Sequence, residues 1–473
     1  MTVRWGAAAL VAVGLIGGVL LPTGTASAVH GAVPGDFNGD GYRDAVLPAP
    51  GANVAGKEAA GAVVVLYGSS SGLAASRRKT ITQNTSGVPG TAEAYDRFGA
   101  ATATADLNRD GYADLVVTSP YEDTPKGKDS GAVTVLWGSR SGLTSGTDLP
   151  SPATAADDPA YYGLDVSALS LGAGAATRIA VAGYDGSVFF SGPFRRTGSY
   201  GSVEYNRNTP SVESVALGDF DRQGVPDPAV VTTRLDGLSG GQVYGDPLIG
   251  NELRQGNGLI AAAGDINGDG YHDLVAGDPD EPDADGADGA LGGRVLVWYG
   301  SGNGVLTDAK PVQITQNTAG VPGASEKGDD FGAALAVTDL NRDGLADIVV
   351  GSPNEDLAKT DAGQVTVVPG RRSGALGTGA YSFSQDTAGV PGASEAYDTF
   401  GATVSAGDVN KDGRPELFVG APGENNYTGA VWALPGGTSR PTATGSRLFT
   451  AASVGLTQAD STLLGGNGLL WIA

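Results

Sequence analysis

The sequence has no cysteine among its 473 residues, which excludes disulfides, thiolate metal sites and cysteine nucleophiles. It has two histidines, His30 and His272, and neither stands in a pattern with the serine or aspartate partners of a nucleophilic triad. Phosphate-binding glycine loops and histidine-based zinc spacings are also missing. A carboxylate pair for glycoside hydrolysis stays open, because the chain has 52 acidic residues.

Basic residues are few, with 29 against 52 acidic ones and a formal charge of −23. Such a surface repels nucleic acid and anionic membranes, so we expect neither as a partner. Glycine is abundant, with 77 residues, and 40% of the chain is hydrophobic, mostly in short β-branched runs. This composition favours a large core built from short strands and tight turns.

A nine-residue acidic motif recurs five times, with oxygen-bearing side chains at positions 1, 3, 5 and 9 and a glycine at position 6. With a backbone carbonyl at position 7, this set suits a hard cation that takes about six to eight oxygens, which predicts about five Ca²⁺ sites. The alternative, an ordinary acidic hairpin turn, does not explain five copies. The predicted metal ligands are Asp36, Asn38, Asp40, Tyr42 and Asp44; Asp106, Asn108, Asp110, Tyr112 and Asp114; Asp265, Asn267, Asp269, Tyr271 and Asp273; Asp339, Asn341, Asp343, Leu345 and Asp347; and Asp408, Asn410, Asp412, Arg414 and Glu416.

The first 28 residues have the pattern of a secretory signal peptide. Arg4 precedes the apolar run 7–21, and Ala26-Ser27-Ala28 forms a small-residue cleavage site. A membrane anchor is the alternative, but the apolar run is too short to span a bilayer. We therefore expect residues 1–28 to be removed and residues 29–473 to be a secreted, extracellular monomer without a membrane span.

The acidic motif is one part of a longer repeated unit. A Phe-Gly or Asn-Gly pair precedes it, as at Phe98-Gly99, and an apolar strand ending in proline follows it, as at Ser119-Pro120. Two further strands complete each unit, and four short strands per repeat indicate a propeller blade. Two more units are degenerate: residues 219–227 have Gln223 at position 5, and residues 160–205 lack the acids. The predicted fold is all-β, a seven-bladed propeller of four-stranded antiparallel blades.

The two ends of the chain bear on ring closure. No Phe-Gly pair precedes Asp36, so blade one is expected to lack its innermost strand. The C-terminal segment 466–473 matches residues 256–261, which lie in an inner strand of another unit. We therefore predict that 466–473 completes blade one and closes the ring, which removes an exposed sheet edge. A frayed apolar tail is the alternative.

The Phe-Gly pairs, acidic loops and Gly-Ala-Pro turns resemble the FG-GAP repeat of the integrin α-subunit N-terminal propeller and its bacterial relatives. Phe400-Gly401 and Gly420-Ala421-Pro422 give both halves of that signature. The resemblance covers residues 29–473 and implies a seven-bladed propeller with Ca²⁺ in some of its loops. Gln223 departs from the pattern, which puts a metal at 219–227 in doubt. Leg domains, a membrane span and a β partner are not visible, so integrin signalling is not implied.

A second repeat begins at Gln83, Gln316 and Gln385 and carries Gly-Val-Pro-Gly or a close variant before a glutamate. We expect these connections on the face opposite the acidic loops. The sequence places the loops with Glu122, Glu355 and Glu424 on the same face, and Asp96, Asp330 and Asp398 at the ends of the connections. Such a face could bind a carbohydrate or a cationic protein segment. Alternatively, the connections are stiff turns that lock adjacent blades.

The sequence as a whole predicts a secreted, Ca²⁺-stabilised propeller that acts as an extracellular binding or adhesion module for a glycan or protein ligand. The alternative is a propeller hydrolase or lyase acting on an extracellular glycan or phosphodiester, for which no convergent acid–base set is visible. A purely structural surface-layer component is the third possibility.

Overall fold

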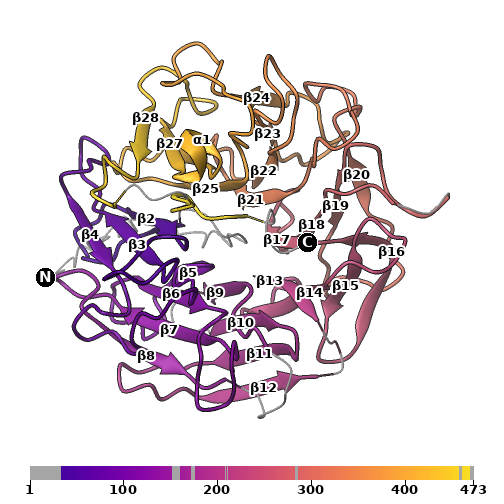
Figure 1. The fold of residues 1–473 in the computed structure, drawn as a ribbon. Coiled ribbons are helices and arrows are strands. Elements are labelled where there is room, and N and C mark those ends of the chain that lie inside the picture. Colours follow the sequence, from indigo (N-terminus) through magenta and orange to yellow (C-terminus); the bar gives the residue numbers. More distant parts are fainter. Residues whose placement is uncertain are drawn as a thin grey trace, which may run out of the picture.

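The computed structural model describes residues 33–151, 160–171, 176–207, 209, 211–282, 286–457 and 461–468. These residues form seven four-stranded antiparallel sheets, each with its strands in sequence order. Figure 1 shows the sheets arranged as a ring, so the predicted seven-bladed propeller is confirmed. The predicted signal peptide, 1–28, lies outside the described residues.

The strands of the first four blades run as follows. Blade one consists of β1 (Val33–Gly35), β2 (Asp44–Ala49), β3 (Ala62–Leu66) and β4 (Arg78–Ile81). Blade two consists of β5 (Thr102–Ala105), β6 (Asp114–Ser119), β7 (Ala132–Trp137) and β8 (Ser145–Leu149). Blade three consists of β9 (Val166–Ser170), β10 (Thr177–Gly183), β11 (Gly186–Ser191) and β12 (Ser202–Asn206). Blade four consists of β13 (Val212–Gly218), β14 (Asp227–Thr232), β15 (Gly241–Asp246) and β16 (Asn251–Gly258).

The other three blades follow the same order. Blade five consists of β17 (Ile260–Gly264), β18 (Asp273–Asp278), β19 (Arg294–Trp298) and β20 (Val312–Ile314). Blade six consists of β21 (Ala334–Thr338), β22 (Asp347–Ser352), β23 (Gln364–Val368) and β24 (Tyr381–Phe383). Blade seven consists of β25 (Thr403–Gly407), β26 (Glu416–Ala421), β27 (Ala430–Leu434) and β28 (Arg447–Thr450), with the short helix α1 (Glu424–Tyr427) after β26.

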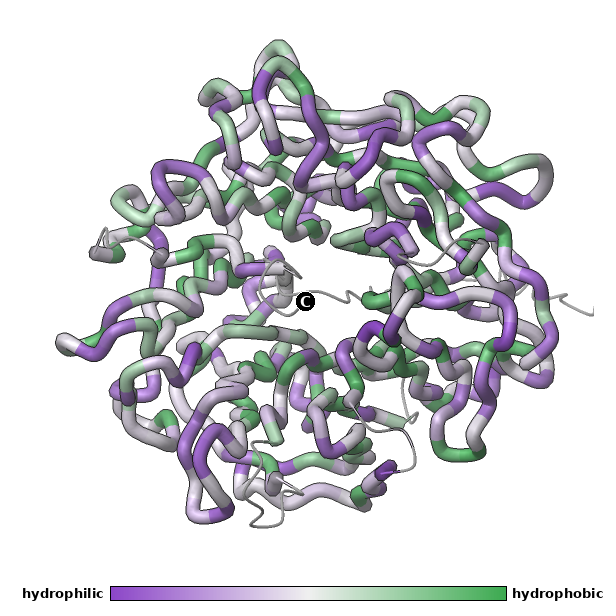
Figure 2. The backbone as a smooth tube through the Cα atoms, turned by 45° about the vertical axis from the view of Figure 1, so that its right-hand side comes forward, coloured by the Kyte–Doolittle hydropathy of each residue, from purple (hydrophilic) through white to green (hydrophobic). Residues whose placement is uncertain are grey.

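The hydrophobic core lies between adjacent blades. Every residue of β2, β22 and β26 is buried, because both faces of these strands are covered by neighbouring sheets. The cluster between blades six and seven joins Val349 and Val365 to Phe400 and Trp432, whose rings meet edge-on at 5.3 Å. Figure 2 shows hydrophobic residues along the strands and hydrophilic residues in many of the connecting loops.

The Phe-Gly pairs place one blade against the next. Phe98, Phe331 and Phe400 are fully buried at these junctions. The position after the phenylalanine requires glycine. Gly401 has a φ of +99°, and a Cβ there would lie 2.6 Å from the carbonyl oxygen of Gln364. The pair therefore combines a large buried ring with a close backbone approach.

The ring is closed by both ends of the described chain. Strand β1 pairs with β2 and also contacts β25, so the expectation that blade one has no inner strand of its own is wrong. This strand could not be recognised from the sequence, because Val33–Gly35 has only three residues and no Phe-Gly pair before it. These residues occupy the positions opposite Asp44, Ala45 and Val46.

The C-terminal segment also reaches blade one. Gly465 N–H donates to Pro48 O at 2.8 Å, and Gly51 N–H donates to Thr462 O at 3.2 Å. Gly99 makes the corresponding bond to Thr118 in blade two, so Leu464-Gly465 takes the place of a Phe-Gly pair. Closure by the C-terminal segment is therefore supported through residue 468. The prediction that it continues as a strand concerns 469–473, which lie outside the described residues.

Within the described residues, no helix has the length and apolar character needed to cross a membrane.

Candidate functional site

The five predicted metal loops have the same backbone frame. Each connects the first and second strands of a blade, and its glycine at position 6 has a positive φ, as Gly41 (86°) and Gly344 (85°) do. The carboxylate at position 1 accepts the N–H of that glycine. The distances are 2.8 Å at Asp36, 3.0 Å at Asp106, 2.9 Å at Asp265, 2.9 Å at Asp339 and 2.8 Å at Asp408.

Positions 3 and 5 tighten the same turn. The side-chain oxygen of Asn38 accepts the N–H of Asp40 at 2.9 Å, and Asp40 accepts the N–H of Tyr42 at 2.9 Å. The residues at position 7 donate to position 5 in the same way in the other four loops, through the N–H groups of Tyr112, Tyr271, Leu345 and Arg414. These bonds place the oxygen-bearing side chains of positions 1, 3 and 5 on one turn, and the residue types fit a Ca²⁺ ligand set. The three acids of each of these loops do not all lie within 4.8 Å of one another.

The acid at position 9 has a second task that the sequence did not reveal. Asp44 is fully buried and accepts N–H groups from Phe37 and from Gly68, both at 3.0 Å. Asp114, Asp273 and Asp347 hold the corresponding pair of amides in their blades. Glu416 holds the amide of Val409 at 2.9 Å and the side chain of Asn410 at 2.7 Å. These acids therefore tie each loop to its blade.

Burial sets the electrostatics of the position-9 acids. It raises the pKa of Asp44, Asp114, Asp273, Asp347 and Glu416 to about 7, despite the backbone donors that favour the charged form. The neighbouring carboxylates at positions 1 and 5 repel the charge further. A divalent cation at the loop would remove this repulsion.

Two substitutions in one loop separate these roles. Asp347→Ala leaves the buried amides of Leu340 and Gly370 without an acceptor, so we expect it to destabilise the fold by about 2–5 kcal/mol even in chelator. Asp343→Ala removes an exposed side chain and should change stability in chelator by less than about 1 kcal/mol. Urea unfolding of both variants in excess chelator makes the comparison. Equal losses of stability in the two variants would contradict the distinction between a structural acid at position 9 and a metal ligand at position 5.

The degenerate loop with Gln223 differs from the other five. In the described part of the chain, Asp219, Asp221 and Asp227 are the one group of three acids whose oxygens all lie within 4.8 Å of one another. One carboxylate oxygen of Asp227 is buried without a hydrogen-bond partner, whereas Asp114 has both oxygens bound to amides. The loop that departs in sequence therefore has the most convergent carboxylates.

The acidic loop of blade two, residues 106–114, has a basic side chain beside it. The guanidinium of Arg196, from blade three, lies 2.7 Å from the Oδ2 atom of Asp110. Asp110 is a predicted ligand, so Arg196 competes with a metal ion for this oxygen. No other position-5 acid in the described residues has such an ion pair.

The face opposite the acidic loops brings the second repeat together as expected. Gln83 donates to Glu122 of the next blade at 2.5 Å, and Gln385 donates to Glu424 at 2.7 Å. These contacts support the interpretation that the connections lock adjacent blades. The predicted acid Asp330 is corrected to Asp329: the Glu326 N–H bonds to Asp329, as the Glu93 N–H bonds to Asp96, while Asp330 accepts from Asn354.

An acidic aromatic cluster lies where blades two, three and four meet. Glu213 sits at a β-bulge at the start of β13, where other inner strands have Ala100, Ala333 or Ala402. Its side chain is 5% exposed, and one of its oxygens has no hydrogen-bond partner. Glu213 was not among the predicted site residues, and its one signal in the sequence is a charge within an apolar strand.

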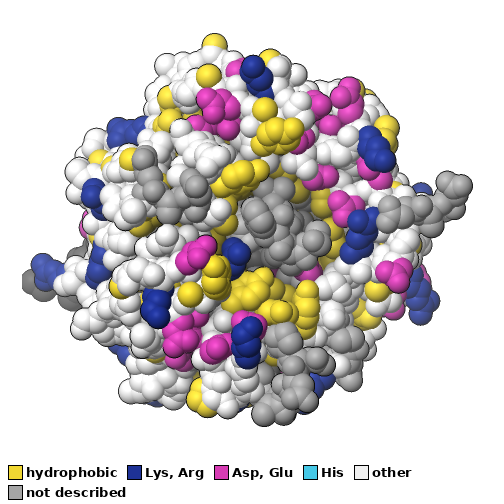
Figure 3. All heavy atoms as spheres, viewed as in Figure 1, with side chains coloured by type: hydrophobic (Ala, Val, Ile, Leu, Met, Phe, Trp, Pro, Cys, Tyr) yellow, Lys and Arg dark blue, Asp and Glu magenta, His cyan; other side chains and the backbone are white. Residues whose placement is uncertain are grey.

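Glu213 interacts electrostatically with Tyr121 and Tyr184, and the ring of Tyr161 contacts the rings of both. The ring of Tyr161 lies 5.2 Å from that of Tyr121 and 5.0 Å from that of Tyr184, both edge-on. Burial, and to a smaller extent the charge of Glu213, raises the pKa of Tyr184. The guanidinium of Arg97 lies 5.6 Å from the centre of the Tyr121 ring. Figure 3 shows hydrophobic side chains gathered toward the middle of one face of the ring, with acidic groups near them.

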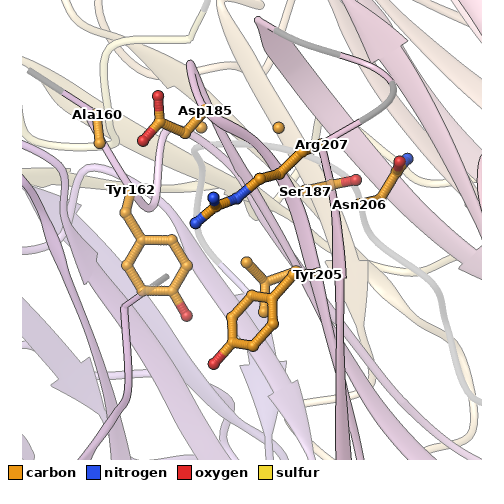
Figure 4. A pocket seen from close by; sticks show the side chains of 10 residues that line it. Ala160, Tyr162, Asp185, Ser187, Tyr205, Asn206 and Arg207 are labelled. Atoms are coloured by element: carbon orange, nitrogen blue, oxygen red, sulfur yellow. The ribbon is translucent and has the colours of Figure 1, made fainter. Parts of the chain in front are cut away.

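A small pocket in blade three lies beside this cluster. Tyr162 takes the place of the buried phenylalanine of other blades, and its hydroxyl has no hydrogen-bond partner. Ser187 is also buried without a partner for its hydroxyl. Figure 4 shows that Tyr162 and Tyr205 lie on one side of the pocket, whereas Ser187 and Asn206 lie on the other. The two unpaired hydroxyls do not converge, so we assign no ligand to this pocket.

A family model described as the FG-GAP repeat matches residues 28–66, 98–136, 331–368 and 400–434. The chain therefore contains FG-GAP repeats in these four segments. It is 32% identical to phosphatidylinositol-glycan-specific phospholipase D of Bos taurus over 187 residues, which are 38% of this chain and 21% of that protein. It is 31% identical to integrin alpha pat-2 of Caenorhabditis elegans over 194 residues, 38% of this chain and 14% of that protein.

The matched part of this chain spans about a fifth or less of the length of these curated relatives. Among solved structures, it is similar to the exotype rhamnogalacturonan lyase YesX, with a TM-score of 0.39, 14% identity, and coverage of 83% of this chain and 70% of that one. The repeats and the seven blades confirm the resemblance to the integrin α propeller.

Proposed function

We propose that this chain is a secreted, Ca²⁺-stabilised binding or adhesion module that engages a cationic segment of an extracellular protein. Glu213 carries the proposal. The carboxyl of Glu213 is buried with one unpaired oxygen and lies near Tyr121 and Tyr184. An ammonium or guanidinium group brought there would meet tyrosine ring faces, and its charge would lower the raised pKa of Glu213 and so favour the ionised carboxylate. The named integrin relatives are consistent with such a role.

The acidic loops would serve the fold rather than the ligand. When bound, Ca²⁺ would supply positive charge between the carboxylates at positions 1, 5 and 9 of each loop. The position-9 acids join the loops to the blades, so a filled loop would stiffen the ring that holds the tyrosines and Glu213 in place. The 28-residue signal pattern and the acidic composition support an extracellular site of action.

Catalysis is the less supported alternative. Asp165 is the acid whose charge acts on Glu213. Its oxygens already accept the Val166 N–H at 2.7 Å, the Ser214 hydroxyl at 2.8 Å and the Val215 N–H at 3.0 Å. It is therefore a structural group, and Glu213 lacks an acid–base partner. Steady turnover of a glycan or phosphodiester by the full chain would favour a hydrolase or lyase instead.

Binding to a lysine-rich peptide tests the proposal. We expect the full chain to bind this peptide, and to lose most of that binding when the peptide lysines are acetylated, because acetylation removes the charge. Glu213→Gln should weaken binding at least tenfold. Asp308→Asn, at an exposed acid of blade five, removes the same charge and should not. Equal affinity of both variants, or binding of neutral glycans only, would contradict the proposal.

The pH dependence of stability offers a second measurement at Glu213. Burial, with the charge of Asp165 second, raises the pKa of Glu213 from 4.5 to about 8. Between these values the folded state keeps a proton that the unfolded state has lost, so the free energy of unfolding falls as the pH rises. We expect Glu213→Gln to melt progressively higher than the parent chain from pH 5 to pH 8. A constant gap across this range would contradict the raised pKa.

A further inference from the structure

Three junctions between blades share one arrangement of polar side chains on the face opposite the acidic loops. A glutamine follows the outer strand of one blade, an aspartate comes 13 residues later, and a glutamate comes 39 residues after the glutamine, on the next blade. The junctions join blades one and two, five and six, and six and seven. The sets are Gln83, Asp96 and Glu122; Gln316, Asp329 and Glu355; and Gln385, Asp398 and Glu424.

The contacts within each set are the same. The glutamine amide nitrogen donates to the glutamate, at 2.5 Å for Gln83 and 2.7 Å for Gln385, and Gln316 makes the same bond to Glu355. Each aspartate accepts one backbone N–H, and at the third junction Gln385 also bonds to Asp398. Besides burial, the charge of the aspartate raises the pKa of the glutamate at each junction, so the amide and both carboxylates are neighbours in space.

These groups are short of donors. The three glutamines are between 1% and 4% exposed, and the amide oxygen of each has no hydrogen-bond partner. The three aspartates are equally buried. None of the six carboxylates forms an ion pair with a lysine or arginine of the described chain. Each junction therefore gathers oxygens and negative charge that nothing in the described chain neutralises.

Locking adjacent blades does not require such a set. At the junction of blades seven and one, Ala451 occupies the position of the glutamine. It comes two residues after Phe449, which pairs with the third strand of blade seven, just as Gln83 comes two residues after Ile81, which pairs with the third strand of blade one. Ala52 stands where the glutamates do, eight residues after the acid that starts the second strand. Both alanines are buried. An apolar junction thus closes the same ring, and the buried charges at the other three need a different reason.

We propose that each of these three junctions binds one divalent hard cation, with Ca²⁺ as the ion of an extracellular medium. A half-turn of the glutamine amide exchanges its nitrogen and oxygen and presents the oxygen to the same space as the two carboxylates. The three side chains then offer up to five oxygens, and water completes the shell. A divalent ion balances both carboxylates, whereas one shared proton leaves a buried negative charge.

Ion counting by native mass spectrometry of the full chain, stripped with chelator and refilled with Ca²⁺, tests this. Glu424→Gln should bind one ion fewer than the parent, and the triple variant Glu122→Gln, Glu355→Gln, Glu424→Gln should bind three fewer. The control Asp308→Asn should bind the full number. In chelator, the triple variant should melt at or above the parent temperature, because it lacks the repulsion between carboxylates.

An unchanged ion count in the triple variant would overturn the proposal and show that the carboxyls are neutral or that the set only locks the blades. Should the triple variant fail to fold, the pair Gln385→Ala and Glu424→Ala copies the apolar junction of Ala451 and Ala52 and is read in the same way, with one ion lost. No partner ligand takes part in this assay, so failure of the proposed binding function would leave its result unchanged.

Discussion

A chain truncated after residue 460 is expected to melt far below the full chain and to aggregate. The lost segment buries Leu463 and Leu464 between blades seven and one, and each buried leucine contributes about 1.5–3 kcal/mol. It also supplies backbone bonds to both blades: Leu464 N–H donates to Thr428 O at 3.0 Å and Gly465 N–H to Pro48 O at 2.8 Å. Their loss exposes sheet edges that can pair with other chains.

A shorter deletion and a point substitution refine this test. Removing only 469–473 should have a much smaller effect if closure rests on 461–468. Gly51→Ala should reproduce part of the large effect, because a Cβ there would lie 1.6 Å from the carbonyl oxygen of Ser461. Thermal melts and light scattering rank the loss of stability and the aggregation of the three variants: truncation after residue 460, deletion of 469–473 and Gly51→Ala. Equal damage from the short deletion would show that ring closure depends on 469–473 as well.

Most of the fold could be predicted because each blade repeats the same signals. Phe-Gly pairs, acidic loops and apolar second strands occur at fixed spacing, and the buried rings of Phe98, Phe331 and Phe400 explain why the phenylalanine is needed. Strand β1 could not be predicted, since three residues carry no periodicity. Its position is set by pairing with β2 and by contact with β25 of blade seven, and this contact exists only when the ring is closed.

The site was predicted less completely than the fold, because it depends on side chains from different blades. The motif identified which loop residues carry oxygens, but not that Asp347 holds two buried amides or that Arg196 reaches Asp110. Glu213 was missed because a single charge in a strand has no pattern, and its meaning depends on tyrosines from other segments of the chain.

Removal of Ca²⁺ is the other change with a large expected effect. In each loop without an ion, the acids at positions 1 and 5 repel the charge of the buried acid at position 9, as Asp106 and Asp110 do at Asp114. When the free ion concentration is about one hundred times the dissociation constant of a site, binding stabilises the folded state by about 2.7 kcal/mol per site. For the five predicted sites together, excess chelator should lower the melting temperature by far more than any single surface substitution.

Ion counting connects this loss to particular loops. Asp343→Ala should lose one ion, because position 5 supplies an exposed carboxylate ligand. Gln223→Ala should lose none, since the three acids that converge in its loop, Asp219, Asp221 and Asp227, are left in place. Magnesium at equal ionic strength serves as the control for screening, because it accepts the geometry of these loops less readily. A melting temperature that chelator leaves unchanged would mean that the acidic loops hold the blades together through their backbone bonds alone.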